Sequence, residues 1–263
     1  EGMQRYARKN VLISGGGSGI GHAICLRLAA EGANIILIDK DLQGGQAVEQ
    51  ELKLQNTKAL FIRADITSEA DVEKVHKEAT LFFGTIDVLV NNAGAAFAEN
   101  YAMTTLENWN QDIALNLTGH YMLTRLFLPD MEAQGKGAIT NISSVNGAQS
   151  FGNPAYSAAK AGVISFTQTL AIEYGPKGIR ANVVLPGTIE TPVWQTRKDS
   201  RPEVFELVKE WYPVGRVGRP EDIAAAVAFL SADEASFING ASLNVDGGLT
   251  AGNFRMIKDI TGE

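Results

Sequence analysis

Seven short runs of almost continuously apolar residues recur along this 263-residue chain, and longer amphipathic stretches separate them. A strand covered by helices on both faces carries a run of this kind, whereas a strand with one face in water alternates apolar and polar residues. Alternating strands and helices fold into a parallel sheet with right-handed crossovers. The sequence therefore predicts strands over residues 10–14, 34–39, 59–65, 87–93, 137–143, 180–186 and 242–246.

Helical patterns fill the intervals between these strands, and no linker or internal repeat divides the chain. We expect residues 1–263 to form a single domain of the α/β class, doubly wound and Rossmann-type, with about seven parallel strands and helices on both faces. Glu1 and Gly2 precede Met3 and are not expected to belong to the fold. The helices are expected over residues 19–31, 41–55, 68–83, 104–133, 154–174 and 220–231.

Residues 188–219 interrupt the alternation of strands and helices, because they form a long insertion between a strand and the next helix. Long insertions in compact α/β domains are usually lids or binding loops. We interpret this one as a substrate lid; the alternative is a surface excursion without a function.

A glycine-rich turn follows the first expected strand and opens the first expected helix. Gly15 permits the tight turn, Gly19 lets the backbone approach a pyrophosphate, and Gly21 permits close packing of helix on strand. The helix N-terminus offers free N–H groups and a partial positive charge to phosphates. A Walker-type loop is excluded, because His22 and Ala23 stand where that loop requires Lys and Ser or Thr. The turn therefore predicts a dinucleotide site.

Asp39 ends the second expected strand, eighteen residues after Gly21. A carboxylate there accepts hydrogen bonds from the adenosine ribose hydroxyls and repels a 2′-phosphate. The position predicts NAD as the cofactor in preference to NADP. Lys40 is the nearby cation that could weaken this preference.

Further motifs follow in order along the chain. They are Ser14-Gly15-Gly16-Gly17-Ser18-Gly19-Ile20-Gly21, Asp65-Ile66, Asn91-Asn92-Ala93-Gly94, Asn116, Ser144, Tyr156 with Lys160, and Pro186-Gly187. Together, from about Arg8 to Leu249, they make the chain closely resemble the short-chain dehydrogenase/reductase family. Ser14 stands where that family more often has Thr, a change that keeps the hydroxyl.

The resemblance implies which residues hold a nicotinamide dinucleotide. Residues 65 and 66 would flank the adenine, residues 92–94 would line the cofactor, and residues 186–191 would bracket the nicotinamide. The implied cofactor-binding set is Gly15, Gly17, Ser18, Gly19, Ile20, Gly21, Asp39, Asp65, Ile66, Asn92, Ala93, Gly94, Tyr156, Lys160, Pro186, Gly187, Ile189 and Thr191.

Tyr156 and Lys160 lie four residues apart, on one face of a helix expected to begin at Asn153 as N-cap and Pro154 as first residue and to stop at Gly175. An ammonium about 4 Å away, at an effective dielectric constant near 20, stabilises a phenolate by about 4 kcal/mol. That energy corresponds to roughly three pKa units. We therefore expect Lys160 to lower the pKa of Tyr156 toward neutrality, which makes Tyr156 a general acid/base.

The resemblance implies roles for the remaining catalytic residues. Ser144 would hydrogen-bond the substrate oxygen, and Lys160 would also hold the nicotinamide ribose. Asn116 would kink its helix and hold a water that links Lys160 to solvent. A glycine three residues downstream, Gly147, favours Ser144 as the active serine, whereas the family's more usual spacing to the tyrosine favours Ser143.

Composition and residue spacing exclude other classes. The net charge of −7 and pI near 5.1 argue against nucleic-acid binding. No apolar run is long enough for a membrane span, and the first residues lack a signal-peptide core, so a cytoplasmic location is expected. Cys25 alone cannot form a disulfide within the chain and is expected to be buried, and the three histidines lack metal-ligand spacing, so no metal is expected.

The sequence thus predicts an NAD(H)-dependent oxidoreductase that interconverts a secondary alcohol and a ketone, with Tyr156 as general acid/base. One alternative is a 3-oxoacyl-type reductase that uses NADPH. The other is a non-catalytic, dinucleotide-sensing regulator, which the intact Ser144, Tyr156 and Lys160 disfavour.

The substrate is expected to be a small-molecule alcohol or ketone: a polyol, sugar or hydroxy acid. Its pocket is expected to draw on Ala95, Ala96, Phe97, residues 146–153, Trp194, Phe205, Trp211 and Tyr212. The four lid aromatics could equally be packing anchors. The resemblance implies a homo-oligomer, a dimer or tetramer, and residues 250–263 are expected to reach a neighbouring subunit.

Overall fold

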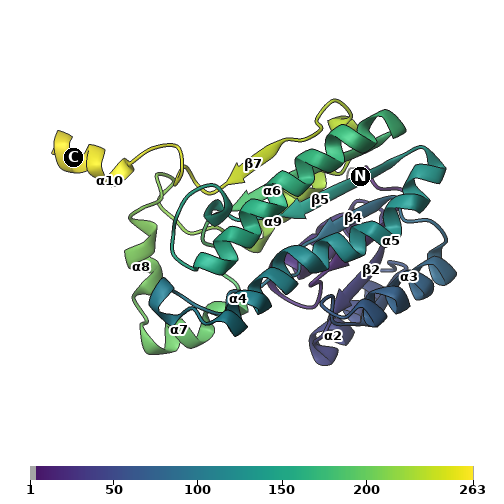
Figure 1. The fold of residues 1–263 in the computed structure, drawn as a ribbon, viewed down its shortest axis with the longest axis horizontal. Helices are drawn as coiled ribbons and strands as arrows, with labels where there is room; N and C mark the ends of the chain where they lie inside the picture. The colour runs from purple at the N-terminus through teal and green to yellow at the C-terminus, as the bar shows by residue number, and fades with distance from the viewer. Residues whose placement is uncertain (1–3, 263) are drawn as a thin grey trace.

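The computed structural model describes residues 4–262, so Glu1 and Gly2 lie outside the described residues. Seven parallel strands form one sheet in the order β3-β2-β1-β4-β5-β6-β7 (Figure 1). This confirms the predicted Rossmann-type class. The strands are β1 (Asn10–Ser14), β2 (Asn34–Asp39), β3 (Ala59–Arg63), β4 (Val88–Asn91), β5 (Gly137–Ile142), β6 (Ile179–Pro186) and β7 (Ser242–Val245).

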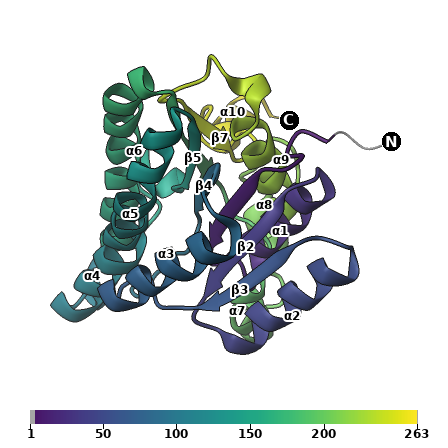
Figure 2. The same ribbon diagram turned by 90° about the vertical axis from the view of Figure 1, so that its right-hand side faces the viewer.

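Helices cover both faces of the sheet (Figure 2). Alternate β1 residues separate the two cores: Val11 and Ile13 pack with α1, α2 and α9, whereas Leu12 packs with α3, α5 and α6. Cys25 is fully buried in the first core, as predicted. The helices are α1 (Gly19–Ala30), α2 (Leu42–Leu54), α3 (Glu69–Phe83), α4 (Leu106–Ile113), α5 (Gly119–Gln134), α6 (Pro154–Tyr174), α7 (Gln195–Ser200), α8 (Val204–Lys209), α9 (Pro220–Leu230) and α10 (Phe254–Thr261).

The segment expected to be one helix over residues 104–133 is divided. A π-helical turn, Ala114–Thr118, separates α4 from α5 and carries the buried Asn116 at its centre. An asparagine side chain that bonds to nearby backbone competes with regular helical hydrogen bonds, which favours such a turn. The regular α-helix is therefore interrupted at Asn116, where a kink was predicted.

The insertion after β6 forms the short helices α7 and α8, with a 3-10 turn at Pro192–Trp194 before them. Its base is closed by a parallel bridge between Ile189 and Gly218. In Figure 1, α7 and α8 lie to the left of α4, and α10 lies at the far left, apart from the sheet. None of the residues of α10 is buried. Among residues 4–262, no helix is long and apolar enough to cross a bilayer.

Asn153 is the N-cap residue of α6 and Pro154 is its first residue, as predicted, but the Asn153 side chain does not bond to the first turn. Asn153 precedes the helix in a left-handed conformation, with φ 48°, and makes no side-chain cap. Its Nδ2 instead donates to the Ala98 carbonyl at 2.8 Å, and its backbone N–H donates to the Glu99 carbonyl at 2.9 Å. Asn153 thus ties the start of α6 to the loop after β4.

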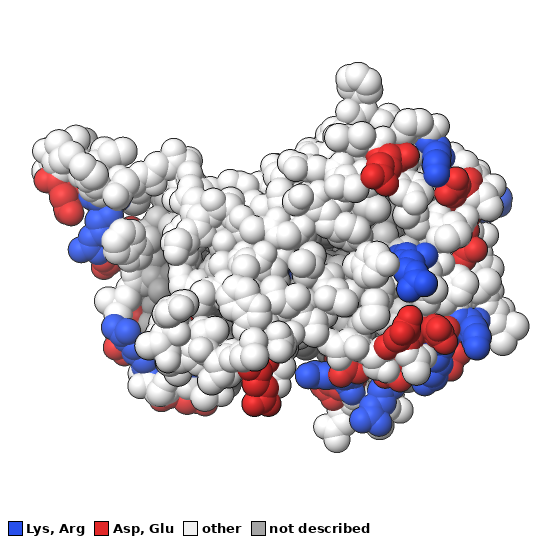
Figure 3. All heavy atoms as spheres, viewed as in Figure 1, with Lys and Arg blue, Asp and Glu red and all other residues white. Residues whose placement is uncertain are grey.

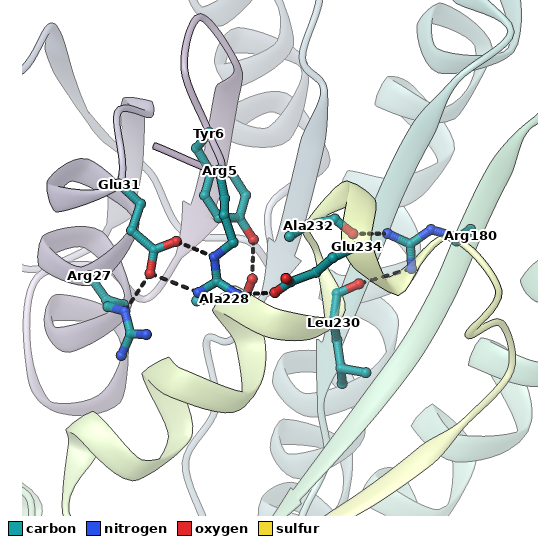
Figure 4. A network of polar contacts seen from close by, with 9 residues as sticks. All are labelled: Arg5, Tyr6, Arg27, Glu31, Arg180, Ala228, Leu230, Ala232 and Glu234. Carbon is teal, nitrogen blue, oxygen red and sulfur yellow. Dashed lines mark hydrogen bonds and ion pairs between the residues drawn. The ribbon is translucent and has the colours of Figure 1, made fainter. Parts of the chain in front are cut away.

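A polar network fastens the N-terminal segment to α1 and α9 (Figure 4). Arg5 donates to both Glu31 oxygens at 2.6 and 2.8 Å and pairs with Glu234, while Arg27 reaches Glu31 at 2.6 Å. Burial alone would raise the pKa of Glu31, but the hydrogen bonds from Arg5 and Arg27 lower it below its ordinary value. The network therefore stabilises the fold above the ordinary carboxyl pKa, and its contribution falls as the pH drops below that value.

Replacing Arg5 by Ala is expected to lower the free energy of unfolding at pH 7 by about 2 kcal/mol, because it removes two hydrogen bonds from a largely buried carboxylate. Thermal or denaturant unfolding measures this loss, which should shrink below pH 4. Lys9→Ala is the control, because its partner Asp233 is 87% exposed and surface pairs contribute little. Equal losses in the two variants would contradict the assignment.

Candidate active site

The glycine turn joins β1 to α1 at the carboxyl end of the sheet. Gly15 has a φ of 67°, and a Cβ there would lie 2.9 Å from the Ala93 Cα. A Cβ on Gly21 would lie 1.9 Å from the Gly15 carbonyl oxygen, so only glycine fits. The tight turn and the close helix–strand approach expected of these glycines are both present.

A clasp of hydrogen bonds joins this turn to the end of β4. The Ser14 Oγ accepts from the backbone N–H groups of Asn92 and Ala93 at 3.0 and 3.1 Å. In return, Asn92 Nδ2 donates to the Ser14 and Gly15 carbonyls at 3.0 and 3.2 Å. The clasp shows why a hydroxyl is needed at position 14, and it fixes residues 92–94 beside the glycine turn.

Asp39 lies beside the glycine turn at the end of β2. Its Oδ2 accepts from the Gly17 N–H at 3.0 Å, and its Oδ1 accepts from the Asp41 N–H at 3.0 Å. A Cβ on Gly17 would lie 2.9 Å from that Oδ2, so Gly17 permits this close approach. The carboxylate lines the same cavity as the glycine turn, with Lys40 next to it.

Asp65 and Ile66 follow β3 and reach the same cavity. The Asp65 carboxylate is occupied locally, because its Oδ1 accepts from the Thr67 hydroxyl at 2.7 Å and from the Thr67 N–H at 2.9 Å. Ile66 is 4% exposed, and a Cβ on Gly119 would lie 2.7 Å from its Cδ1. Ile66 therefore packs against the first turn of α5 as well as toward the cavity.

The two candidate serines after β5 have different surroundings. Ser143 is 2% exposed and its Oγ donates to the Lys160 carbonyl at 2.7 Å, so it is bound to the backbone of α6. The Ser144 Oγ accepts from the Asn146 N–H at 3.1 Å and lies beside Tyr156. Both line the cavity, but only the Ser144 hydroxyl is placed next to the phenol.

Tyr156 and Lys160 project from one face of α6, as predicted. The Lys160 Nζ lies 5.5 Å from the centroid of the Tyr156 ring and donates to the Ile142 carbonyl at 2.9 Å. Lys160 is 2% exposed, and burial lowers its pKa to about 7 against the opposing effect of the Asp112 carboxylate. At neutral pH the amine of Lys160 is therefore only partly protonated.

The expectation that Lys160 lowers the pKa of Tyr156 toward neutrality is wrong for the chain's own residues. Burial raises the pKa of Tyr156 above its ordinary value, the Ser144 hydroxyl opposes the rise, and Asp112 adds to it. The expectation treated desolvation of the phenol as a partial opposition, whereas desolvation is the largest influence here, and it did not include the carboxylate of Asp112. Tyr156 is thus held as a neutral phenol.

Asn116 is fully buried, and its amide is used by the backbone. Its Nδ2 donates to the carbonyls of Ala95 and Asp112 at 2.7 and 2.9 Å, and its Oδ1 accepts from the Ala95 N–H at 3.2 Å. A Cβ on Gly94 would lie 2.7 Å from that Oδ1 and 3.2 Å from the Lys160 Nζ. Asn116 therefore positions the loop after β4 against Lys160.

The end of β6 forms the opposite wall. Pro186, Gly187, Ile189 and Thr191 all line the cavity, and a Cβ on Gly19 would lie 3.3 Å from the Thr191 Cβ. The Thr191 segment therefore faces the glycine turn across a narrow gap.

The aromatic residues of the 188–219 insertion divide between two roles. Tyr212 is 3% exposed and its hydroxyl accepts from the Thr188 N–H at 2.6 Å, so it anchors the insertion to the end of β6. Trp194 lines the cavity and packs against Phe205, with ring centroids 5.3 Å apart, while Trp211 is half-exposed on the surface. Arg197 of α7 pairs with Glu99 of the loop after β4, which joins the insertion to the body of the protein.

A single cavity of about 800 Å³ connects these parts. Gly17, Gly21 and Asn116 do not line it and act through their neighbours. At the substrate end it is bordered by Ala95, Ala96, Asn146, Phe151 and Asn153, whereas Phe97 and Trp211 stay outside. The predicted residues that line it are Gly15, Ser18, Gly19, Ile20, Asp39, Asp65, Ile66, Asn92, Ala93, Gly94, Ser144, Tyr156, Lys160, Pro186, Gly187, Ile189 and Thr191.

Two buried residues of this region were missed by the sequence reasoning. Asp112 and His120 are both fully buried. Asp112 raises the pKa of Lys160, and the charge of Lys160 lowers the pKa of His120. Asp112 and His120 stand four residues before and after Asn116, one helical turn away on either side, and that spacing was the available signal. Within residues 4–262, no group of three His, Cys, Asp or Glu side chains is placed to hold a metal ion.

Comparison with known proteins identifies the class. A family model described as Enoyl-(Acyl carrier protein) reductase matches residues 15–250. A solved oxidoreductase of the short-chain dehydrogenase/reductase family from Burkholderia thailandensis is 42% identical, with a TM-score of 0.90 over 97% of this chain and 98% of that chain. The chain therefore belongs to the short-chain dehydrogenase/reductase family, and it is an NAD(P)-dependent oxidoreductase acting on CH–OH groups.

Curated relatives share its full length. An uncharacterized oxidoreductase of Schizosaccharomyces pombe is 44% identical over 96% of this chain and 95% of its own. The L-fucose dehydrogenase of Bos taurus is 39% identical over 94% of this chain and 92% of its own. The cis-4-hydroxycyclohexanecarboxylate dehydrogenase of Sinomonas cyclohexanicum is 38% identical over 94% and 99%.

The residues present fit a nicotinamide dinucleotide. At Gly15 and Gly94 a side chain would collide with neighbouring atoms, so bare backbone lies beside the cavity at the pyrophosphate and nicotinamide positions expected for this fold. The carboxylate of Asp39 at the end of β2 and the amine of Lys160 on α6 complete the donor and acceptor set.

Gly94→Ala is expected to weaken NADH binding about tenfold, because the added methyl group displaces the Asn116 amide and the Lys160 ammonium. Fluorescence titration measures the change. Gly252→Ala is the matched control, since nothing lies within 4 Å of a Cβ there. Unchanged NADH affinity in Gly94→Ala would show that the cofactor does not depend on this contact.

Proposed function

We propose that this protein is an NAD(H)-dependent oxidoreductase that interconverts a secondary alcohol and a ketone, with Tyr156 as general acid/base. The observation that carries the proposal is the convergence of Ser144, Tyr156 and Lys160 on one end of a cavity whose other end is the glycine turn and Asp39. A protein that only binds a dinucleotide would need the glycine turn and Asp39, but not Ser144, Tyr156 and Lys160.

The side chains divide the chemistry between them. A bound nicotinamide ring supplies or accepts the hydride. The Ser144 hydroxyl holds the substrate oxygen, and the Tyr156 hydroxyl gives a proton to that oxygen in reduction and takes it back in oxidation. Lys160, fixed by its bond to the Ile142 carbonyl, places a positive charge beside the phenol when it is protonated and would hold the cofactor ribose.

Protonation of the resting site favours the reductive half of this cycle. Burial keeps Tyr156 a neutral phenol, which is the form that donates a proton to a ketone oxygen. For alcohol oxidation the phenol must first lose its proton, and the positive charges of Lys160 and of an oxidised nicotinamide favour that loss. We therefore expect oxidation to need a higher pH than reduction.

Asp39 supports NAD as the cofactor. Its carboxylate is held beside the cavity by the Gly17 and Asp41 N–H groups, where a 2′-phosphate would meet its negative charge. Lys40 lines the same part of the cavity and attenuates this repulsion.

We infer a compact, polyhydroxylated or carboxylated substrate: a sugar, polyol or hydroxy acid. The substrate end carries polar side chains, Asn146, Asn153, Glu99 and Arg197, beside the aromatic Trp194. The names of two relatives, an L-fucose dehydrogenase and a hydroxycyclohexanecarboxylate dehydrogenase, are consistent with this class. An acidic carrier protein fits less well, because the charged side chains seen in Figure 3 lie near the edges of the face with both signs together, and the net charge is −7.

We also infer a homo-oligomer, a dimer or tetramer. The face over α4, α5 and α6 carries few charged side chains (Figure 3), and Leu106 and Tyr121 are exposed on α4 and α5. On α10 the exposed apolar residues Met256, Ile257 and Ile260 are suited to contact a neighbouring subunit. Light scattering in solution tests this inference, and a monomer would overturn it.

Tyr156→Phe is expected to lower turnover of a secondary alcohol at least a hundredfold while leaving NADH affinity close to that of the wild type, because only the proton-transfer oxygen is removed. Steady-state kinetics and fluorescence titration measure the two quantities. Tyr121→Phe on α5, outside the cavity, is the control. Retained turnover in Tyr156→Phe would overturn the proposed mechanism, and NADH binding by a wild-type protein that turns over no alcohol or ketone would favour a sensing role.

The wild-type protein is expected to bind NADH more tightly than NADPH, and Asp39→Asn should reduce that preference about tenfold by removing the charge while keeping an acceptor oxygen. Lys40→Ala should change the preference in the opposite direction. Fluorescence titration with each cofactor gives the ratio. Tighter NADPH binding by the wild type would instead support the 3-oxoacyl-type reductase.

A further inference from the structure

Asp112 is a fully buried carboxylate near the end of α4, beside the catalytic centre. We propose that Asp112 is a positioning residue for the reaction at Tyr156: its buried carboxylate supplies the negative charge that faces Lys160, and it holds Asn116 and the loop after β4 in place. This inference rests on the proposed function for the roles of Tyr156 and Lys160.

The contacts of Asp112 place it between the substrate loop and the π-helical turn. Its Oδ2 accepts from the Phe97 N–H at 3.4 Å, and its Oδ1 accepts from Asn116 Nδ2 at 3.3 Å. Both hydrogen bonds are long, and they are weak compensation for the lost hydration of a carboxylate. In the described part of the chain, no basic nitrogen lies within 4.0 Å of its oxygens.

The rest of the compensation for the lost hydration of the Asp112 carboxylate comes from Lys160 on α6, the helix packed against α4. Lys160 is itself fully enclosed, with a single hydrogen bond to the Ile142 carbonyl. Asp112 raises the pKa of Lys160 against the effect of burial, and Lys160 lowers the pKa of Asp112, also against burial. Each charge is therefore tolerable in the interior because the other is present.

Two further titratable groups face this pair. Burial, together with the charge of Lys160, lowers the pKa of His120 to about 3, so the imidazole is neutral across the physiological range and contributes no charge. Asp112 raises the pKa of Tyr156, in the same direction as burial. Asp112 is thus the one group of the four that acts on both Lys160 and Tyr156 as a negative charge.

The sign of the effect follows from these directions. Neutralising Asp112 removes an influence that raises the pKa of Tyr156 and an influence that raises the pKa of Lys160. Both groups then lose their protons at lower pH. A residue with a purely structural role would leave both titrations where they are.

The decisive experiment is an ultraviolet difference titration of the phenolate band in the full-length protein, with Tyr156→Phe subtracted to isolate one of the six tyrosines. In Asp112→Asn we expect the Tyr156 transition to move down by about one pH unit relative to the wild type. Glu107→Gln, on the exposed side of the same helix, is the matched control and should not move it. An unmoved transition in Asp112→Asn would overturn the proposal.

A second neutral variant keeps the test decisive if the asparagine disturbs folding. Asp112→Ser removes the charge without placing amide hydrogens opposite the Phe97 and Asn116 donors, and it must produce the same downward movement. Thermal unfolding reports whether each variant is folded.

Kinetics then distinguish this inference from the proposed function. The acid limb of the kcat/KM profile for alcohol oxidation should move to lower pH in Asp112→Asn, whereas a uniform loss at every pH would indicate disrupted packing and count against a positioning role. If the wild type turns over no alcohol, the proposed function fails, while the spectroscopic titration still decides whether Asp112 acts on Tyr156.

Discussion

The hydroxyl of Ser14 holds the carboxyl ends of β1 and β4 together, and the rest of the site depends on that junction. Helices leave the two strands toward opposite faces of the sheet, so a crevice opens at the point where the strand order reverses. The glycine turn forms one wall of the crevice and residues 92–94 form the other. Because Asn92 bonds back to the turn, neither wall can move without the other.

The candidate catalytic end of the cavity depends on an electrostatic balance inside the protein. A lysine, an aspartate and a tyrosine are removed from water within a few helical turns, and burial opposes the charged form of each. The π-helical turn at Asn116 brings these groups together, since it directs the amide toward Ala95 and places Asp112 on the inner side of α4. The same packing that protects the reaction from water therefore sets the protonation of its side chains.

Much of the fold could be predicted from sequence, because local patterns are strong in a buried parallel sheet. The bounds of β1, β2 and α6 agree with the apolar runs and helical spacing, and the glycines of the turn lie where their lack of a side chain is required. Prediction failed where a side chain has a choice of partners. The side chain of Asn153, the N-cap residue of α6, bonds across to Ala98 instead of to the first turn of its helix, and Asp112 carries no motif that distinguishes it from a surface acid.

The sequence by itself determined the sheet, the crossovers and the candidate cofactor and catalytic residues, because hydrophobic period, glycine positions and residue spacing are properties of the linear chain. Only the tertiary structure decided which serine hydroxyl lies beside Tyr156, which lid aromatic is an anchor, and in which direction the pKa values of Tyr156 and Lys160 move. These properties depend on burial and on charges brought together from separate helices. No local pattern records such distances, since they exist only after the chain has packed.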